Sequence, residues 1–174
     1  MIDGGDFNIR HIRKEDLAEL IPLLNSPEIR GEYLAPSMVS PVEIERKFAQ
    51  DGISNETFER FLIVDKTDQM LGTIFHFKSV PYYNAREIGY TIFSAKNRNT
   101  GIASKAVKLL TRHLFDTLLI NRLEIRTHCR NLASEKVAIK CGFKKGGVAR
   151  GANFVRGKSV DMNVYALLRD EVQM

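Results

Sequence analysis

Hydrophobic and polar residues alternate along some segments of this chain and recur every three or four positions in others. Two-residue alternation, or short runs rich in β-branched and aromatic residues, predicts strands. Recurrence such as Ala103, Ala106, Leu110 and Leu114 predicts an amphipathic helix that begins at Gly101 and runs to Leu119. The predicted strands cover residues 7–12, 61–65, 71–79, 87–93, 121–127, 143–148 and 160–168, and the other predicted helices cover residues 14–24, 41–50 and 132–141.

Local signals set several boundaries of these elements. Ser40-Pro41-Val42-Glu43 has the pattern of a capping box with proline at the first helical position, and it predicts a helix start. Gly142 is expected to end the helix before it. Residues 66–69 predict a hairpin turn. The resulting order of strands and helices predicts one α/β (α+β) domain over residues 1–174, with a central, mostly antiparallel sheet.

A short basic loop joins the strand at 87–93 to the helix from Gly101. Its sequence is Arg98-Asn99-Thr100-Gly101-Ile102-Ala103. Free N–H groups in the first turn of a helix attract anions, and a glycine lets a phosphate approach the backbone. Neither the P-loop pattern nor G-x-G-x-x-G occurs here. The segment therefore predicts a phosphate site of another kind.

Arg98-x-x-Gly101-x-Ala103 resembles the R/Q-x-x-G-x-G/A signature of the GCN5-related N-acetyltransferases, the GNAT superfamily. Further segments match this family in order: residues 8–17 look like its first strand and helix, and residues 123–127 like its fifth strand. Asn131-Leu132-Ala133-Ser134, followed by Cys141-Gly142-Phe143, resembles the N-x-x-S…GF segment of the RimJ/RimL branch, the ribosomal-protein N-terminal acetyltransferases and their relatives. The resemblance covers about residues 8–168.

The resemblance implies a fold whose fourth and fifth strands, here residues 87–93 and 121–127, splay apart to admit the pantetheine arm of acetyl-CoA. Buried backbone amides need partners, and the arm would supply them. The backbone of Thr91, Ile92 and Phe93 is expected to pair with the arm, and Asn131 to contact it or to cap the following helix. The expected pyrophosphate ligands are Arg98 and the N–H groups of Asn99, Thr100, Gly101, Ile102, Ala103 and Ser104.

Acetyl transfer to an amine requires an oxyanion donor, an acid for the leaving thiolate and a route for the amine proton. By resemblance, the backbone N–H of Ile92 or Phe93 is the oxyanion donor. Ser134 matches the serine that this branch places near the cofactor sulfur, where its hydroxyl would protonate or orient the thiolate. The competing role of Ser134 is capping in the first turn of its helix.

The general base is the point at which the sequence departs from its relatives. Arg126 occupies the position of a fifth-strand glutamate, Asn153 that of a glutamate in the turn between the last two strands, and Ala138 that of a tyrosine acid. Glu32 and Glu87 are the candidate bases. A third possibility uses no side-chain base, and the minor neutral amine then reacts and loses its proton through water.

Composition excludes several other classes of protein. The chain of 174 residues is 44% hydrophobic and 27% charged, which is ordinary for a globular domain. No apolar run is long enough to span a membrane, and the N-terminus lacks a basic and apolar leader, so we expect a cytoplasmic location. Cys129 and Cys141 show neither disulfide nor zinc spacing. Cys141 is expected to be a buried thiol, and no metal is expected.

The net charge of +5 raises the possibility of nucleic-acid binding. The basic residues are dispersed, however, and no nucleic-acid-binding motif is present, so part of this charge is expected to face the adenosine phosphates and most of it the solvent. A catalytically inactive CoA-binding or regulatory module is the main alternative. The acceptor is an amine of unknown identity, whose pocket we expect to be built by residues 28–55, 81–86 and 147–158 of a monomer or homodimer.

Overall fold

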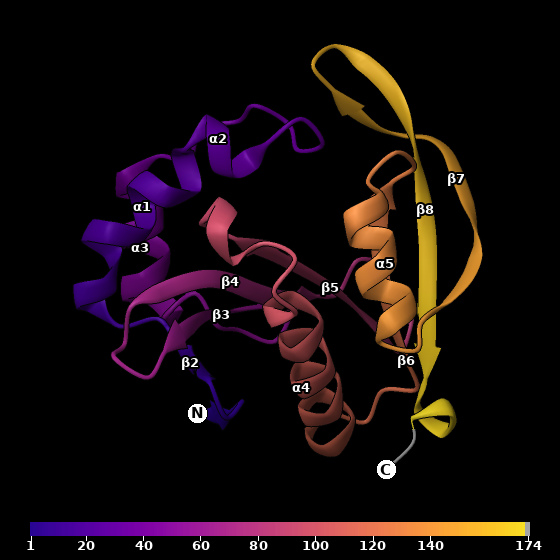
Figure 1. Cartoon of the computed structure of the whole chain (residues 1–174), viewed down its shortest axis with the longest axis horizontal. Coiled ribbons are helices and arrows are strands. Elements are labelled where there is room, and N and C mark those ends of the chain that lie inside the picture. Colours follow the sequence, from indigo (N-terminus) through magenta and orange to yellow (C-terminus); the bar gives the residue numbers. More distant parts are fainter. Residues whose placement is uncertain (173–174) are drawn as a thin grey trace.

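The computed structural model describes residues 1–172, which form one sheet with helices on both faces (Figure 1). The strand order is β1-β2-β3-β4-β5-β6-β8-β7, and all neighbouring strands are antiparallel except β5 and β6. The strands are β1 (Ile2–Asp3), β2 (Phe7–His11), β3 (Phe58–Asp65), β4 (Met70–Phe77), β5 (Ala85–Ile92), β6 (Arg122–His128), β7 (Lys144–Val155) and β8 (Lys158–Leu168). The helices are α1 (Leu17–Asn25), α2 (Pro27–Arg30), α3 (Pro41–Asp51), α4 (Ile102–Thr117) and α5 (Leu132–Lys140). The predicted fold class is confirmed.

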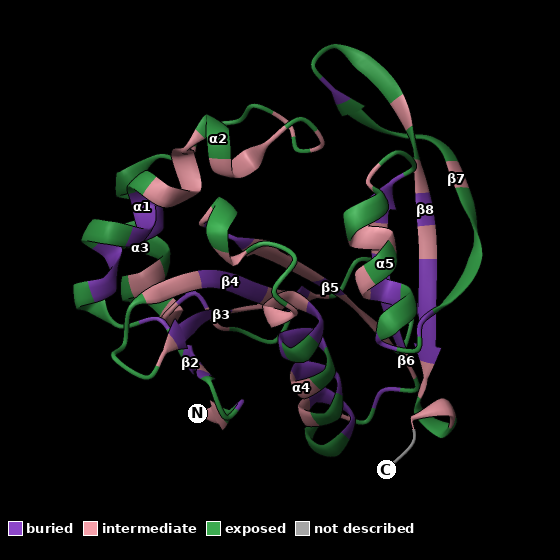
Figure 2. Ribbon diagram, in the orientation of Figure 1, coloured by how far each residue is buried: buried purple, intermediate pink, exposed green. Residues whose placement is uncertain are grey.

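Two apolar cores lie on opposite faces of the sheet because alternate strand residues point in opposite directions. Ile63 and Ile88 pack with Leu110 of α4 in the larger core, which also includes residues of α5. Leu62 packs with Leu20 of α1 in the smaller core, which α3 completes. Leu110, Leu62 and Leu20 have no exposed surface, and burial of such a side chain contributes about 1.5–3 kcal/mol to stability. Figure 2 shows these buried faces around the central strands.

Strands β5 and β6 separate after a short parallel contact. Only Ala85, Arg86 and Glu87 are paired with β6, opposite Arg122, Leu123 and Glu124. Beyond Glu87, β5 continues beside β4 to Ile92, while β6 continues beside β8 to His128. The predicted splay between these strands is therefore present, and it opens toward the loop that precedes α4.

Several predicted details differ from the structure. The helix at Pro41 begins as expected, but the Ser40 side chain makes no capping hydrogen bond. The segment 147–158, expected to help build the acceptor pocket and lying mostly between two predicted strands, belongs largely to β7, whose register shifts between Ala149 and Asn153. These irregular steps interrupt the alternation of side chains, and so the sequence did not indicate a long strand there. The short elements β1 and α2 were not predicted either.

Candidate active site

The turn before α4 presents unpaired backbone donors. After a 3₁₀ turn at Ala95–Asn97, Asn99 (φ 62°) and Gly101 (φ 92°) adopt left-handed conformations, which turn the chain into the helix. The N–H of Lys105 donates to the carbonyl oxygen of Gly101 at 3.0 Å, so the N–H groups of residues 102–104 precede the first intrahelical bond. The helix N-cap is Gly101, whose added Cβ would meet nothing within 4 Å. The space in front of these donors is open.

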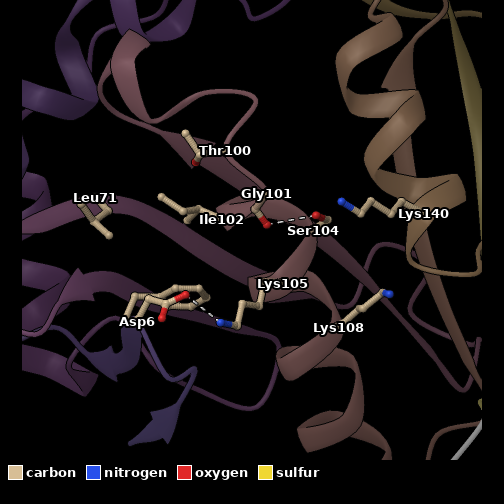
Figure 3. Close-up of a pocket in the computed structure, with 10 residues that line it drawn as sticks. Asp6, Leu71, Thr100, Gly101, Ile102, Ser104, Lys105, Lys108 and Lys140 are labelled. Atoms are coloured by element: carbon tan, nitrogen blue, oxygen red, sulfur yellow. Dashed lines mark hydrogen bonds and ion pairs between the residues drawn. The ribbon is translucent and has the colours of Figure 1, made fainter.

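A hollow lies against this turn, as Figure 3 shows. Lys105 and Lys108 come from α4 and Lys140 from α5, and all three line the hollow together with Gly101. The ammonium of Lys105 also pairs with Asp6, with Nζ and Oδ2 3.0 Å apart. Open N–H groups at a helix N-terminus, with ammonium groups around them, are complementary to the negative charge of the phosphates of CoA. The residues present therefore fit this part of acetyl-CoA.

Some backbone groups of β5 face β4, and others face the opening. The N–H of Phe93 donates to Leu71 of β4 at 3.0 Å. A Cβ added to Gly72 would lie 2.4 Å from the Thr91 carbonyl oxygen, so that carbonyl also faces β4. Because successive peptide groups of a strand point to opposite sides, the N–H of Ile92 faces the opening. The prediction was therefore wrong for the Phe93 N–H and the Thr91 carbonyl, which β4 already engages.

A hydroxyl pair joins β5 to α5 across the splay. The Tyr90 hydroxyl and Ser134 Oγ are 3.0 Å apart. Burial raises the pKa of Tyr90 to about 12, so the phenol is neutral at pH 7 and can donate a proton. Asn131 Oδ1 accepts the N–H of Ser134 at 3.1 Å, so Asn131 is the helix cap. The capping role considered for Ser134 is thus performed by Asn131.

Glu87 lies where the splay begins, on the face of the sheet opposite α4. Arg126 Nε is 3.4 Å from Glu87 Oε2, and only 15% of the Glu87 side chain is exposed. Burial raises the pKa of Glu87 to about 6; Arg126 opposes this shift and nearby Glu124 adds to it. Burial also acts to raise the pKa of Glu124, but hydrogen bonds from Arg122 and Arg126 lower it below its ordinary value. Glu87 therefore changes protonation state closer to neutral pH than an ordinary carboxyl.

Glu32, the other candidate base, is exposed in the loop after α2. Its carboxylate hydrogen-bonds Tyr33, and this bond is the main cause that raises the pKa of the phenol. The Tyr33 ring lies against the His128 ring at the end of β6, with 5.1 Å between ring centroids. Asn153 is exposed in β7, where its Oδ1 accepts the N–H of Phe154 at 2.8 Å. The loop of Glu32 thus reaches the open end of the splay.

The structure also describes the environment of Cys141, the grouping of potential metal ligands and the apolar length of the helices. Cys141 is a buried free thiol as predicted: its Sγ donates to the Ser104 carbonyl oxygen at 3.2 Å, and burial raises its pKa to about 11. Within residues 1–172, His, Cys, Asp and Glu side chains form no group of three or more that could hold a metal ion. Over the same residues, no helix is both long and apolar enough to cross a bilayer.

Tyr90 is the main site residue that the sequence did not identify. Its neighbours Ile88 and Ile92 indicate that its side chain points to the α4 side of the sheet, but nothing local shows that it meets Ser134, because that contact depends on the splay. Lys105 and Lys108 were also missed. Their spacing places both on one face of α4, and this was the available signal.

Comparison with known proteins agrees with this geometry. Residues 6–144 match the acetyltransferase (GNAT) domain. The chain is 30% identical over 168 residues to an uncharacterized N-acetyltransferase, p20, of Bacillus licheniformis, across 94% of this chain and 93% of that protein. It is 27% identical over 137 residues to ribosomal-protein-serine acetyltransferase of Escherichia coli (strain K12), across 78% and 76% of the two chains. Its fold is similar to that of spermidine N-acetyltransferase from Vibrio cholerae in complex with CoA and spermine, with a TM-score of 0.82, 18% identity and coverage of 95% and 97%.

The family match covers most of the chain and includes the strands that splay and the helix that follows them. The curated relatives extend the similarity to nearly all residues and include a ribosomal-protein acetyltransferase. The chain belongs to the GNAT acetyltransferase family, in its RimJ/RimL-like branch, whose acetyl donor is acetyl-CoA.

Proposed function

We propose that this chain transfers the acetyl group of acetyl-CoA to a primary amine, by direct attack while both substrates are bound. The amine is a protein N-terminus or belongs to a small molecule. The observation that carries the proposal is the group of donors along the splay, where the Ile92 N–H faces the opening and the neutral Tyr90 phenol meets Ser134 at 3.0 Å. A cytoplasmic location and a monomeric or homodimeric state stay predictions.

Donor binding is assigned to the turn before α4. The N–H groups from Asn99 to Ser104, with Arg98 beside them, bind the pyrophosphate, while Lys105, Lys108 and Lys140 neutralise further phosphate charge. Asn131 contacts the pantetheine arm while its side chain caps α5. The open space at Gly101 and the uncapped N-terminus of α4 support this assignment.

Chemistry is assigned to groups on either side of the opening. The Ile92 N–H donates to the thioester carbonyl oxygen as negative charge develops there. The Ser134 hydroxyl donates its proton to the departing thiolate and is oriented by Tyr90, whose phenol passes its own proton to the serine oxygen and then regains one from solvent. Both hydroxyls are neutral before reaction, so this transfer needs no prior ionisation. The Tyr90–Ser134 contact supports the catalytic role of Ser134 over a capping role.

Glu87 is the base that the geometry favours. Arg126 stands where related enzymes keep a glutamate, and its guanidinium holds the Glu87 carboxylate of the facing strand at 3.4 Å. The shifted pKa, about 6, leaves Glu87 ionised at pH 7 and still basic enough to take an ammonium proton through water. Glu32 is the second candidate, because its loop reaches His128 through Tyr33. Reaction of the minor neutral amine without a side-chain base is the third.

The deciding experiment measures thiol release from acetyl-CoA with a panel of peptides, polyamines, aminoglycosides and amino sugars. We expect CoA release with at least one amine. In Gly101→Glu, a carboxylate faces the phosphate site and the left-handed backbone disfavours a side chain, so acetyl-CoA affinity measured by calorimetry should be lost.

Gly52→Glu is the matched control, because Gly52 also has a left-handed backbone (φ 67°) and open space but ends α3. This control should keep full affinity. Unchanged affinity in Gly101→Glu would remove the assigned phosphate site. Tight binding of acetyl-CoA with no release of CoA for any amine would favour the alternative, an inactive CoA-binding or regulatory module.

A further inference from the structure

Arg60 of β3 is a half-buried cation without an ionic partner among residues 1–172. Its guanidinium carbon lies 5.5 Å from the centroid of the Phe58 ring and 5.0 Å from that of Phe75, so two aromatic rings flank it. Its Nε is buried and has no hydrogen-bond partner. Burial lowers the pKa of Arg60 to about 10, and the nearby positive charge of Arg30 adds to this effect. A desolvated charge without a counter-charge is costly, and a bound anion would remove this cost at Arg60.

Arg60 lies on the same face of the sheet as Glu87, the proposed base. Strand register aligns Arg60 with Phe75 of β4 and Phe75 with Gly89 of β5. A Cβ added to Gly89 would lie 2.3 Å from the Phe75 ring, so this ring covers Gly89 and bridges the space to Arg60. Two strand spacings place Arg60 about 10 Å from β5. Glu87 lies two residues before Gly89 on the same face.

The carboxylates of this face do not neutralise Arg60. Glu87 and Glu124 are held by Arg126, and Glu124 also by Arg122. At one end of the face, the carboxylates of Glu87 and Glu124 are balanced by Arg122 and Arg126, whereas Arg60 has no ionic partner among residues 1–172 and is suited to an anion. Arg30 cannot serve as a second free anion ligand, because its guanidinium already donates to Ala35, Leu24 and Ser37 and so holds the loop that follows α2.

We infer that the acceptor carries a carboxylate or phosphate within about 10 Å of its reacting amine and that Arg60 binds this anion. The inference rests on the proposed transferase function and names its substrate class. A planar guanidinium can bind either a carboxylate or a phosphate through paired hydrogen bonds. The acceptor could therefore be a peptide with an acidic N-terminus or a small amino phosphate.

Matched acceptor pairs test the inference. One arm compares Asp-Ala-Ala amide with Asn-Ala-Ala amide, and the other compares glucosamine 6-phosphate with glucosamine, each in wild type and in Arg60→Met. In wild type the anionic member of at least one pair should have the lower KM. Arg60→Met should raise that KM about tenfold or more, leave the neutral member nearly unchanged and keep acetyl-CoA affinity. Arg60→Met should also fold, because it replaces a half-buried, unpaired charge with an apolar chain.

Arg46→Met is the control, since Arg46 is exposed on α3 and pairs with Glu43. It should reproduce the wild-type KM values. Equal KM values within both pairs, or a preference for the anion that survives in Arg60→Met, would overturn the inference. Calorimetry of the same probes with the CoA complex tests the charge preference without turnover, and equal or absent binding of both members in every pair likewise overturns it. Arg60-dependent anion binding with no acetyl transfer to any amine would instead contradict the proposed function alone.

Discussion

The hydroxyl groups of Tyr90 and Ser134 are hydrogen-bonded to each other at the splay. If Ser134 protonates the leaving thiolate, Ser134→Ala should lower kcat by about 10²–10⁴-fold and leave acetyl-CoA affinity nearly intact, because a leaving-group contact acts in the transition state. Tyr90→Phe should also lower kcat, and the double variant should lose less than the product of the two losses because the groups act as a unit. Steady-state kinetics of the three variants checks this.

Asn131 offers the matched stability control for these variants. Because its side chain caps α5, Asn131→Ala should cost about 0.5–2 kcal/mol of stability, whereas Ser134→Ala should change the melting temperature little. A fully active but destabilised Ser134→Ala would show that this serine serves the helix and not the reaction.

Glu87 should control the rate as pH changes. Its pKa of about 6 predicts that kcat/KM rises as pH increases through 6, since only the ionised carboxylate accepts a proton. Glu87→Gln should remove this limb of the profile and lower the rate at pH 7. Glu32→Gln should keep it. A profile unchanged in Glu87→Gln but lost in Glu32→Gln would move the base to the loop, and a rate that climbs with pH in both variants would indicate reaction of the minor neutral amine.

The same pKa has a consequence for stability. A carboxyl whose folded pKa is raised favours folding in its protonated form, so this contribution is present below pH 4.5 and is lost as pH rises through about 6. The shift corresponds to about 2 kcal/mol. Denaturant unfolding at pH 4.5 and pH 7.5 should therefore show wild type losing stability relative to Glu87→Gln. A constant difference between the two proteins would contradict the raised pKa.

At the scale of elements, Glu59 joins three neighbouring strands. It accepts from His76 of β4 at 3.0 Å and contacts His11 of β2 at 2.9 Å. The bond with His76, with further bonds from Ser54 and His11, lowers the pKa of Glu59 to about 2 although burial opposes the shift. A lowered pKa contributes stability above pH 4.5 that is lost as pH falls through 2.

Glu59→Gln should therefore destabilise the protein by up to about 3 kcal/mol at pH 7. The difference from wild type should shrink as pH is lowered from 4.5 toward 2, as measured by urea unfolding. Glu43→Gln is the comparison, because Glu43 is half-exposed on α3 and pairs only with the exposed Arg46 and Lys47, and it should have little effect at any pH.

The sequence predicted those elements whose signal is local. The period of α4, the strand run before it and Gly101 together indicated the helix start, which is confirmed, and a phosphate site, which stays a prediction. The long β7 was missed because its bulges break the alternation, and α2 was missed because four residues carry no period. The Tyr90–Ser134 contact could not be predicted without knowing how widely β5 and β6 diverge. Arg60 gave no signal, because an arginine in a strand is ordinarily an exposed one.

Across the whole molecule, the splay separates β5 from β6 beyond a short parallel contact, while the larger apolar core packs against both parts of the sheet. The parallel pairing of β5 and β6 ends at Glu87, while at the open end the Tyr33 ring touches His128 and Arg156 Nη2 donates to the Gly31 carbonyl oxygen at 3.3 Å. Figure 1 shows the loop after α2 and the β7–β8 hairpin approaching each other above the opening. The opening in which we propose that the acceptor binds is therefore bounded by segments distant in sequence.

The bond from Phe93 N–H to Leu71 also has a kinetic consequence for two adjacent amides. In deuterated solvent the Phe93 amide should exchange slowly, because it must first break from β4, while the Ile92 amide should exchange much faster. Binding of acetyl-CoA should slow Ile92 far more than Phe93, since only Ile92 gains a new partner. Residue-resolved hydrogen exchange with and without acetyl-CoA measures this difference. Equal slowing of both amides would mean that the donor acts only by raising global stability and does not bond to the edge of β5.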